Sequence, residues 1–243
     1  MHYTPKNITH QPSFDQETSI DFFGDWDDDL AVKIQNAWFD SISLTHKLPD
    51  WIRYMEGASG KKYRYFINNL ISSLEEPRYL EIGTWAGSTA CSALYGNKLT
   101  AVCVDNWSEF GGPRDKFFTN IDRVKSDDID FKFIEDDFNR IDYDKIGKFN
   151  VYMYDGDHSE LNQFNGINKV LPALDDTFIL IVDDWNWQRV RDGTFKAIEV
   201  NSLKISSSIQ IKTQQQEVWW APDVNGPYSD WHNGYFIAII KKA

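Results

Sequence analysis

The stretch Tyr79-Leu-Glu-Ile-Gly-Thr-Trp-Ala-Gly-Ser-Thr89 decides the fold of this chain. The apolar residues that end at Ile82 predict a buried strand, and the residues from Ser88 onward suit a helix. Gly83 and Gly87 lie between them, where a glycine turn lets the backbone approach a ligand and the helix N-terminus offers free N–H groups. A strand, a glycine turn and a helix in this order predict a ligand site, although such glycines also occur in ordinary turns.

Strands and helices alternate on both sides of this stretch. A helix face recurs over residues 63–74, with Ser59 as its N-cap, and the last two strand-like runs have no helix between them. The pattern predicts an α/β fold: a Rossmann-like, doubly wound, mostly parallel seven-stranded sheet with an antiparallel C-terminal strand. The predicted strands cover residues 78–82, 99–104, 131–134, 151–154, 178–182, 209–219 and 235–240, and the later helices lie around 88–95, 114–124, 161–171 and 190–203.

The first 58 residues differ from the rest of the chain. They are rich in Trp and Asp and show only weak helical patterning, around residues 30–44. We therefore expect residues 1–58 to be an N-terminal extension that caps the site or contacts substrate or a second copy, and residues 59–243 to form the domain. Its aromatic residues could cover the partner of a homodimer, and the loop 221–233 is long enough to act as a lid.

The composition excludes several classes of function. The chain has 243 residues and a formal net charge of -12, so it can bury a core but has no attraction for nucleic acid or anionic lipid surfaces. Its two cysteines, Cys91 and Cys103, have neither disulfide nor zinc spacing. No stretch is typical of a signal peptide or a transmembrane helix. We therefore expect a cytoplasmic protein without nucleic-acid or membrane partners.

Acidic residues follow the predicted strands at the same sheet edge as the glycine turn. Asp105 ends the next strand, about twenty residues beyond the turn, where a carboxylate can accept hydrogen bonds from both hydroxyls of a ribose. Asp136 and Asp137 follow the third strand, where an adenine amino group would lie. The chain contains neither Gly-x-Gly-x-x-Gly nor Gly-Lys-Ser/Thr, the motifs of dinucleotide sites and phosphate loops. These strand ends favour a nucleoside cofactor of another kind.

A second acidic group ends the two strands that follow. The segments Tyr154-Asp-Gly-Asp-His158 and Val182-Asp-Asp-Trp-Asn186 bring four carboxylates to one sheet edge. Such carboxylates repel one another unless a cation lies between them, and a divalent ion with oxygen ligands, most simply Mg²⁺, fits. The same residues also suit a site without metal, in which Asp157 and Asp184 cap helices and His158 hydrogen-bonds a neighbour.

The motifs together resemble the class I S-adenosylmethionine-dependent methyltransferases, over roughly residues 59–243. That family opens with Glu/Asp-x-Gly-x-Gly-x-Gly, and Trp85 stands here at the middle glycine. This departure resembles the metal-dependent O-methyltransferases of the catechol and caffeoyl-CoA type, and Asp-Gly-Asp-His resembles a motif of sugar O-methyltransferases in antibiotic pathways.

The resemblance implies a role for each motif residue. Asp105 would hold the ribose of S-adenosylmethionine, and Asp136 and Asp137 would lie near its adenine. His158 or Asp157 would take the proton of the acceptor hydroxyl. The residues implied to line the methionine half are Glu81, Gly83, Thr84, Gly87 and Ser88, and the implied metal ligands are Asp155, Asp183 and Asp184.

The expected function is O-methylation of a small hydroxylated molecule, with S-adenosylmethionine as cofactor and with Mg²⁺ if the carboxylates hold it. Two alternatives stay open: a metal-independent methyltransferase for nitrogen or carboxylate acceptors, and a protein that binds S-adenosylmethionine without catalysis. An NAD-linked oxidoreductase is disfavoured because the third glycine of its motif is missing.

Overall fold

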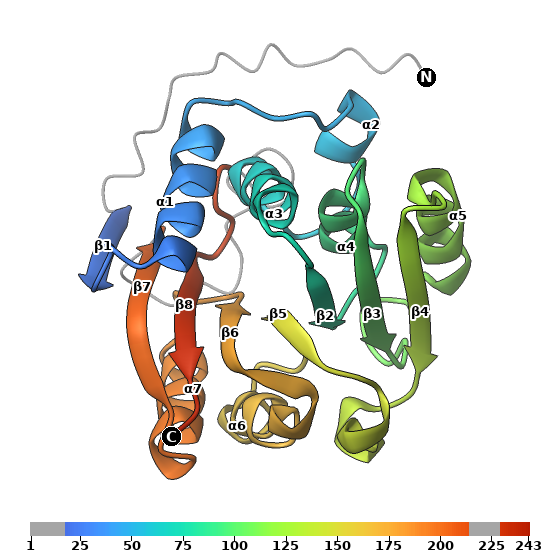
Figure 1. The fold of residues 1–243 in the computed structure, drawn as a ribbon. Coiled ribbons are helices and arrows are strands. Elements are labelled where there is room, and N and C mark those ends of the chain that lie inside the picture. Colours follow the sequence, from blue (N-terminus) through green and yellow to red (C-terminus); the bar gives the residue numbers. More distant parts are fainter. Residues whose placement is uncertain (1–17, 214–228) are drawn as a thin grey trace, which may run out of the picture.

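The computed structural model describes residues 18–213 and 229–243. Within them the strands form one mixed sheet of eight strands in the order β1-β7-β8-β6-β5-β2-β3-β4 (Figure 1). The strands are β1 Ser19–Gly24, β2 Arg78–Ile82, β3 Leu99–Asp105, β4 Ile129–Glu135, β5 Phe149–Tyr154, β6 Leu174–Val182, β7 Lys204–Lys212 and β8 Tyr235–Lys241. The helices are α1 Asp29–Ile42, α2 Asp50–Arg53, α3 Lys61–Ser73, α4 Ser88–Leu94, α5 Arg114–Val124, α6 Glu160–Asn168 and α7 Gln188–Val200.

The predicted Rossmann-like architecture is confirmed. Strands β4, β3, β2, β5 and β6 pair in parallel, and β8 pairs antiparallel with both β6 and β7. From β2 the chain runs outward to β3 and β4, and it then returns to β5 on the other side of β2. Loops that follow β2 and β5 therefore meet at the point where ligands bind in open parallel sheets.

Alternate residues of the central strands enter two separate cores, one on each face of the sheet. On β2, Tyr79 belongs to the core beneath α1, α3, α4 and α5, whereas Leu80 and Ile82 belong to the core beneath α6 and α7. The two-residue period of a strand explains this division, because successive side chains point to opposite faces. Both faces are covered, which is why the central strands read as continuous apolar runs.

The sheet has one more strand than predicted. β1 comes from the N-terminal extension and pairs antiparallel with β7, with Ser19 opposite Lys212 and Gly24 opposite Ser207. The expected strand at 209–219 is instead β7, which ends at Lys212; residues 214–219, and residues 221–228 of the expected lid loop, lie outside the described residues.

The described part of the extension packs onto the rest of the protein. Asp28 caps α1 by accepting a hydrogen bond from the backbone N–H of Leu30 (2.9 Å). The buried face of α1, with Ala31, Ile34 and Ala37, joins the same core as α3. Residues 18–58 therefore share a hydrophobic core with the domain. No helix in the described ranges is both long enough and apolar enough to cross a membrane.

Candidate active site

The parallel register aligns the ends of three neighbouring strands. Ile82 of β2 lies opposite Tyr154 of β5, which in turn lies opposite Val182 of β6. The residues that follow these three positions therefore emerge side by side at one sheet edge. This brings the glycine turn and the two acidic segments together, as the sequence predicted.

Backbone hydrogen bonds connect the turn after β2 to the ends of β3 and β5. Gly83 donates its backbone N–H to Val104 (2.9 Å), and the N–H of Asp155 bonds to Ile82 (2.9 Å). Gly83 has a φ of +86°, and a Cβ at this position would overlap the carbonyl oxygen of Asp155. The position therefore requires glycine both for its backbone conformation and for this close approach.

Asp105 joins the turn after β2 to the turn after β3. Its carboxylate accepts hydrogen bonds from the backbone N–H of Trp85 (2.8 Å) and of Trp107 (2.7 Å). Both tryptophans have positive φ values, +42° and +58°, which non-glycine residues rarely adopt. The two elements expected to hold the adenosyl group are thus in direct contact.

Glu81 lies beneath the turn. It is fully buried, and its carboxylate oxygens accept hydrogen bonds from the hydroxyls of Tyr79 (2.5 Å) and Thr89 (2.5 Å). Of the other residues expected around the methionine half, Thr84 has a buried hydroxyl that finds no hydrogen-bond partner in residues 18–213 and 229–243, and the Ser88 hydroxyl contacts that of Ser59 (3.0 Å). Glu81 therefore connects the end of β2 to the first turn of α4 beneath the glycine turn.

Burial raises the pKa of Glu81 to about 7, although the hydrogen bonds from Thr89 and Tyr79 oppose this shift. The folded protein then keeps the proton as pH rises from about 4.5 to 7, whereas the unfolded chain loses it. We expect this group alone to lower the free energy of unfolding by about 3 kcal/mol across that window, and to have no further effect above it. Urea unfolding at both ends of the window should show this loss in the wild type but not in Glu81→Gln. A Gln substitution at the exposed Glu75 is the control, and equal pH slopes for all three proteins would contradict the assignment.

The two expected adenine contacts, Asp136 and Asp137, make local hydrogen bonds after β4. The Asp136 carboxylate accepts from Arg140 (2.9 Å at Nε), and this hydrogen bond lowers the pKa of Asp136. Asp137 caps the short 3₁₀ turn Phe138–Arg140 by accepting from the N–H of Asn139 (2.8 Å). In this arrangement both carboxylates serve local turns at the end of β4.

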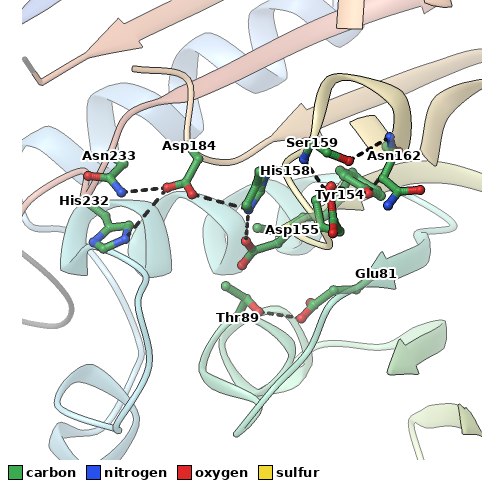
Figure 2. Close-up of polar contacts among 12 residues, drawn as sticks. Glu81, Thr89, Tyr154, Asp155, His158, Ser159, Asn162, Asp184, His232 and Asn233 are labelled. Carbon is green, nitrogen blue, oxygen red and sulfur yellow. Dashed lines mark hydrogen bonds and ion pairs between the residues drawn. The ribbon is translucent and has the colours of Figure 1, made fainter. Parts of the chain in front are cut away.

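His158 lies between two of the acidic side chains (Figure 2). Its Nε2 atom is 3.4 Å from Oδ1 of Asp155 and 3.3 Å from Oδ2 of Asp184, and its Nδ1 atom is buried without a hydrogen-bond partner in the part of the chain that the structure describes. The side chain keeps 15% of its exposure. One ring nitrogen therefore faces carboxylates, and the other, although buried, makes no hydrogen bond to the described residues.

Asp155, Asp183 and Asp184 are close enough for their negative charges to repel one another. Burial, followed by the charge of Asp184, raises the pKa of Asp155 well above its usual range, and burial with the charge of Asp155 does the same for Asp183. Among the residues that the structure describes, the buried Oδ1 atom of Asp183 also has no hydrogen-bond partner. Asp184 adopts a φ of +55°, a conformation that costs energy and that often marks functional sites.

The donor types suit a divalent cation, but their arrangement does not yet form a ligand set. Across residues 18–213 and 229–243, no three His, Cys, Asp or Glu side chains converge closely enough to hold a metal ion. Asp157 is exposed and accepts a hydrogen bond from the N–H of Ser159 (2.7 Å), the N-cap of α6. Asp157 therefore serves the start of α6.

Two further residues complete this group. Asn233 donates to Oδ1 of Asp184 (2.8 Å), and Nε2 of His232 lies 4.0 Å from the same oxygen (Figure 2). The strand pairing contains a signal for them, because Val182 lies opposite Phe236 in the antiparallel β6–β8 pair. The residues just before β8 must then face those just after β6.

This fold, with a glycine turn at the carboxyl edge of a mostly parallel sheet, is the fold of S-adenosylmethionine-dependent methyltransferases. Residues 80–185 match the model of a family described as a methyltransferase domain. No curated protein matches the chain. The partial family match and the fold together support an S-adenosylmethionine-dependent methyltransferase.

Solved methyltransferases share the fold at low sequence identity. The S-adenosylhomocysteine-bound methyltransferase PaMTH1 of Podospora anserina is 13% identical, with a TM-score of 0.54 over 89% of this chain and 88% of that one. A candidate O-methyltransferase of Klebsiella pneumoniae is 14% identical (TM-score 0.50, 88% and 90% covered). A candidate RNA methyltransferase of Pyrococcus horikoshii is also 14% identical (TM-score 0.50, 87% and 98%). The chain spans about half the length of two further matched structures, 48% in each case.

Proposed function

We propose that this chain transfers the methyl group of S-adenosylmethionine to a hydroxyl group of a small molecule. The observation that carries the proposal is the position of His158, whose ring lies between Asp155 and Asp184 and whose buried Nδ1 has no hydrogen-bond partner within the described residues. The backbone of Asp155 abuts Gly83, so the group around His158 directly adjoins the turn proposed to hold the cofactor. A base next to a methyl donor is the arrangement that O-methylation needs.

The residues around His158 can move the acceptor proton. With Nε2 facing the two carboxylates, Nδ1 is the ring atom left to accept the proton of an acceptor hydroxyl, and because it is buried the acceptor must first displace the groups that cover it. Asp155 and Asp184 then stabilise the imidazolium that forms. Asn233 keeps Asp184 oriented toward the ring. When bound, S-adenosylmethionine supplies an electrophilic methyl carbon attached to a sulfonium sulfur. As the acceptor oxygen bonds to this carbon, the carbon–sulfur bond breaks and the sulfur leaves as a neutral thioether.

A small acceptor is favoured over nucleic acid. The net charge of -12 gives no attraction for a phosphate backbone. The RNA methyltransferase among the structural neighbours is related by fold alone, at 14% identity. We keep the cytoplasmic location and the homodimer as predictions.

A divalent cation is the second candidate for activating the acceptor. Asp155, Asp183 and Asp184 are its candidate ligands, with Oδ1 of Asp183 unpartnered within the described residues, but these side chains would have to move closer together to hold it. A bound Mg²⁺ would lower the pKa of a coordinated hydroxyl. Turnover that is lost in EDTA and restored by Mg²⁺ would assign these aspartates as ligands. Turnover that persists in EDTA would leave His158 as the activating group.

Two measurements test the proposal. Calorimetry should show that the protein binds S-adenosylhomocysteine and does not bind NADH. Methyl-labelled S-adenosylmethionine should then transfer its label to members of a panel of sugars, phenols and other small hydroxylated molecules, but not to amine or carboxylate analogues. Binding without any transfer would favour a non-catalytic protein, whereas transfer to amines or carboxylates would favour the metal-independent alternative.

A further inference from the structure

The first turn of α3, together with Ser59 just before it, lies between the glycine turn after β2 and the residues that precede β8. On one side it faces Ser88, the first residue of α4 after the glycine turn. On the other it faces residues 229–234, which carry His232 and Asn233 to Asp184. The sequence indicated neither contact, because Ser59 reads as a simple N-cap, whereas the N-cap of α3 is Gly60 and Ser59 points elsewhere.

Arg64 fixes the segment before α3 with its whole guanidinium group. It is fully buried, and its Nη1 atom donates to the carbonyls of Ile52 (2.9 Å), Arg53 (3.1 Å) and Met55 (2.8 Å). Its other nitrogens donate to the carbonyl of Gly57 (3.2 Å) and to the hydroxyl of Ser59 (2.9 Å). These five hydrogen bonds hold residues 52–59 around one buried cation. Burial lowers the pKa of Arg64 to about 10.

The segment that Arg64 holds contacts the cofactor turn directly. The Ser59 hydroxyl, held by Nε of Arg64, lies 3.0 Å from the Ser88 hydroxyl. Gly57 lies so close to Ser88 that a Cβ on Gly57 would overlap the Ser88 side chain. A shift of the turn at Gly87 and Ser88 must therefore be transmitted to Ser59.

The opposite side of the same turn contacts residues 229–234. The backbone N–H groups of Lys61 and Lys62 donate to the carbonyls of Ser229 (2.9 Å) and Asp230 (3.0 Å). Both lysines also form ion pairs with the Asp230 carboxylate, at 3.2 and 2.8 Å. A Cβ at Gly60 would overlap the Asp230 carbonyl, so the two backbones are in close contact.

We propose that the first turn of α3 couples the cofactor turn to the Asp184 side of the site. Ser59 and Arg64 are positioning residues on the cofactor side, and Asp230 is the positioning residue on the other. This inference rests on the proposed function, because it assigns the bound group at the glycine turn as the signal. Occupation of that turn holds Ser88 and Ser59, orders α3 against Asp230, and so fixes Asn233 against Asp184.

Amide hydrogen exchange with S-adenosylhomocysteine tests the coupling without a known acceptor. In the wild type, saturating ligand should slow exchange at Trp85 and Gly87 in the cofactor turn. It should also slow exchange at Asn186 and Gly234, whose N–H groups bond to the carbonyls of Asn233 (2.9 Å) and Trp231 (2.8 Å), by about fivefold or more. Protection at Trp85 and Gly87 without protection at Asn186 and Gly234 would overturn the coupling but leave the proposed function intact. No protection at either place would overturn both.

Three variants show whether the signal passes through α3. In Ser59→Ala we expect the cofactor turn to remain protected at saturating ligand, while the protection at Asn186 and Gly234 is lost. Asp230→Asn breaks the ion pairs on the other side and should give the same pattern, which covers the case that Ser59→Ala does not fold. Ser73→Ala is the matched control, because its hydroxyl bonds only within the last turn of α3, to Leu70 (2.7 Å). Full protection at Asn186 and Gly234 in both test variants would overturn the proposal.

Discussion

Replacing His158 by asparagine should reduce methyl transfer by about 10²- to 10⁴-fold, the usual contribution of a positioned general base. The substitution removes the unpartnered Nδ1 atom, which is the proposed proton acceptor, and leaves Asp155 and Asp184 without the ring between them. The affinity for S-adenosylhomocysteine should stay unchanged, because Gly83 and Asp105 are untouched. Single-turnover transfer of labelled methyl to an acceptor from the panel measures the first quantity, and calorimetry measures the second.

His46→Asn is the control for this substitution. His46 stacks on Tyr65 with ring centroids 4.0 Å apart, outside the acidic group, so its loss should leave methyl transfer intact. Asp157→Asn addresses the other residue that the sequence suggested as a base. Because Asp157 accepts from the Ser159 backbone, an asparagine oxygen can replace it, and we expect only a small effect. If Asp157→Asn loses the activity and His158→Asn keeps it, the roles are reversed and our mechanism is wrong.

The sequence predicts the centre of the sheet well because burial on both faces leaves a simple signal. The bounds Arg78–Ile82 of β2 and Arg114–Val124 of α5 agree with the residues predicted. β1 gave no such signal, since Phe22 and Phe23 keep 38% and 51% of their exposure and the strand has no buried face to read. Its partner β7 also lies far away in the sequence, and local patterning does not indicate such a pairing.

The candidate site is predictable in its composition but not in the directions of its side chains. Strand ends placed Asp155, Asp183 and Asp184 together, because parallel register alone determines that edge. Whether a carboxylate faces the site or caps its own turn depends on side-chain rotamers and local donors, which is why Asp137 and Asp157 are found at turns. The charge compensation by His158 likewise depends on distances that no motif specifies.

Gly83→Ala should strongly weaken binding of S-adenosylhomocysteine and also destabilise the fold. A φ of +86° costs an L-residue about 1–2 kcal/mol. A Cβ that overlaps the Asp155 carbonyl must in addition push β2 and β5 apart where the cofactor turn meets the group around His158. We expect a total loss of about 3 kcal/mol or more in the free energy of unfolding, as measured in urea. The same displacement of the turn should lower the affinity for S-adenosylhomocysteine by about 100-fold or more. A 100-fold loss of affinity corresponds to a little less than about 3 kcal/mol of binding free energy.

Gly96→Ala separates the two causes. Gly96 has a φ of +62°, but a Cβ there would come no closer than 3.7 Å to any heavy atom, the nearest being in the Lys47 side chain. This variant should therefore show the backbone cost alone, with the affinity for S-adenosylhomocysteine unchanged. If the two alanine variants bind equally well, close approach at Gly83 does not matter for the ligand. The turn after β2 would then not be the cofactor site, and the direct link from the nucleoside turn to Asp155 would lose its functional meaning.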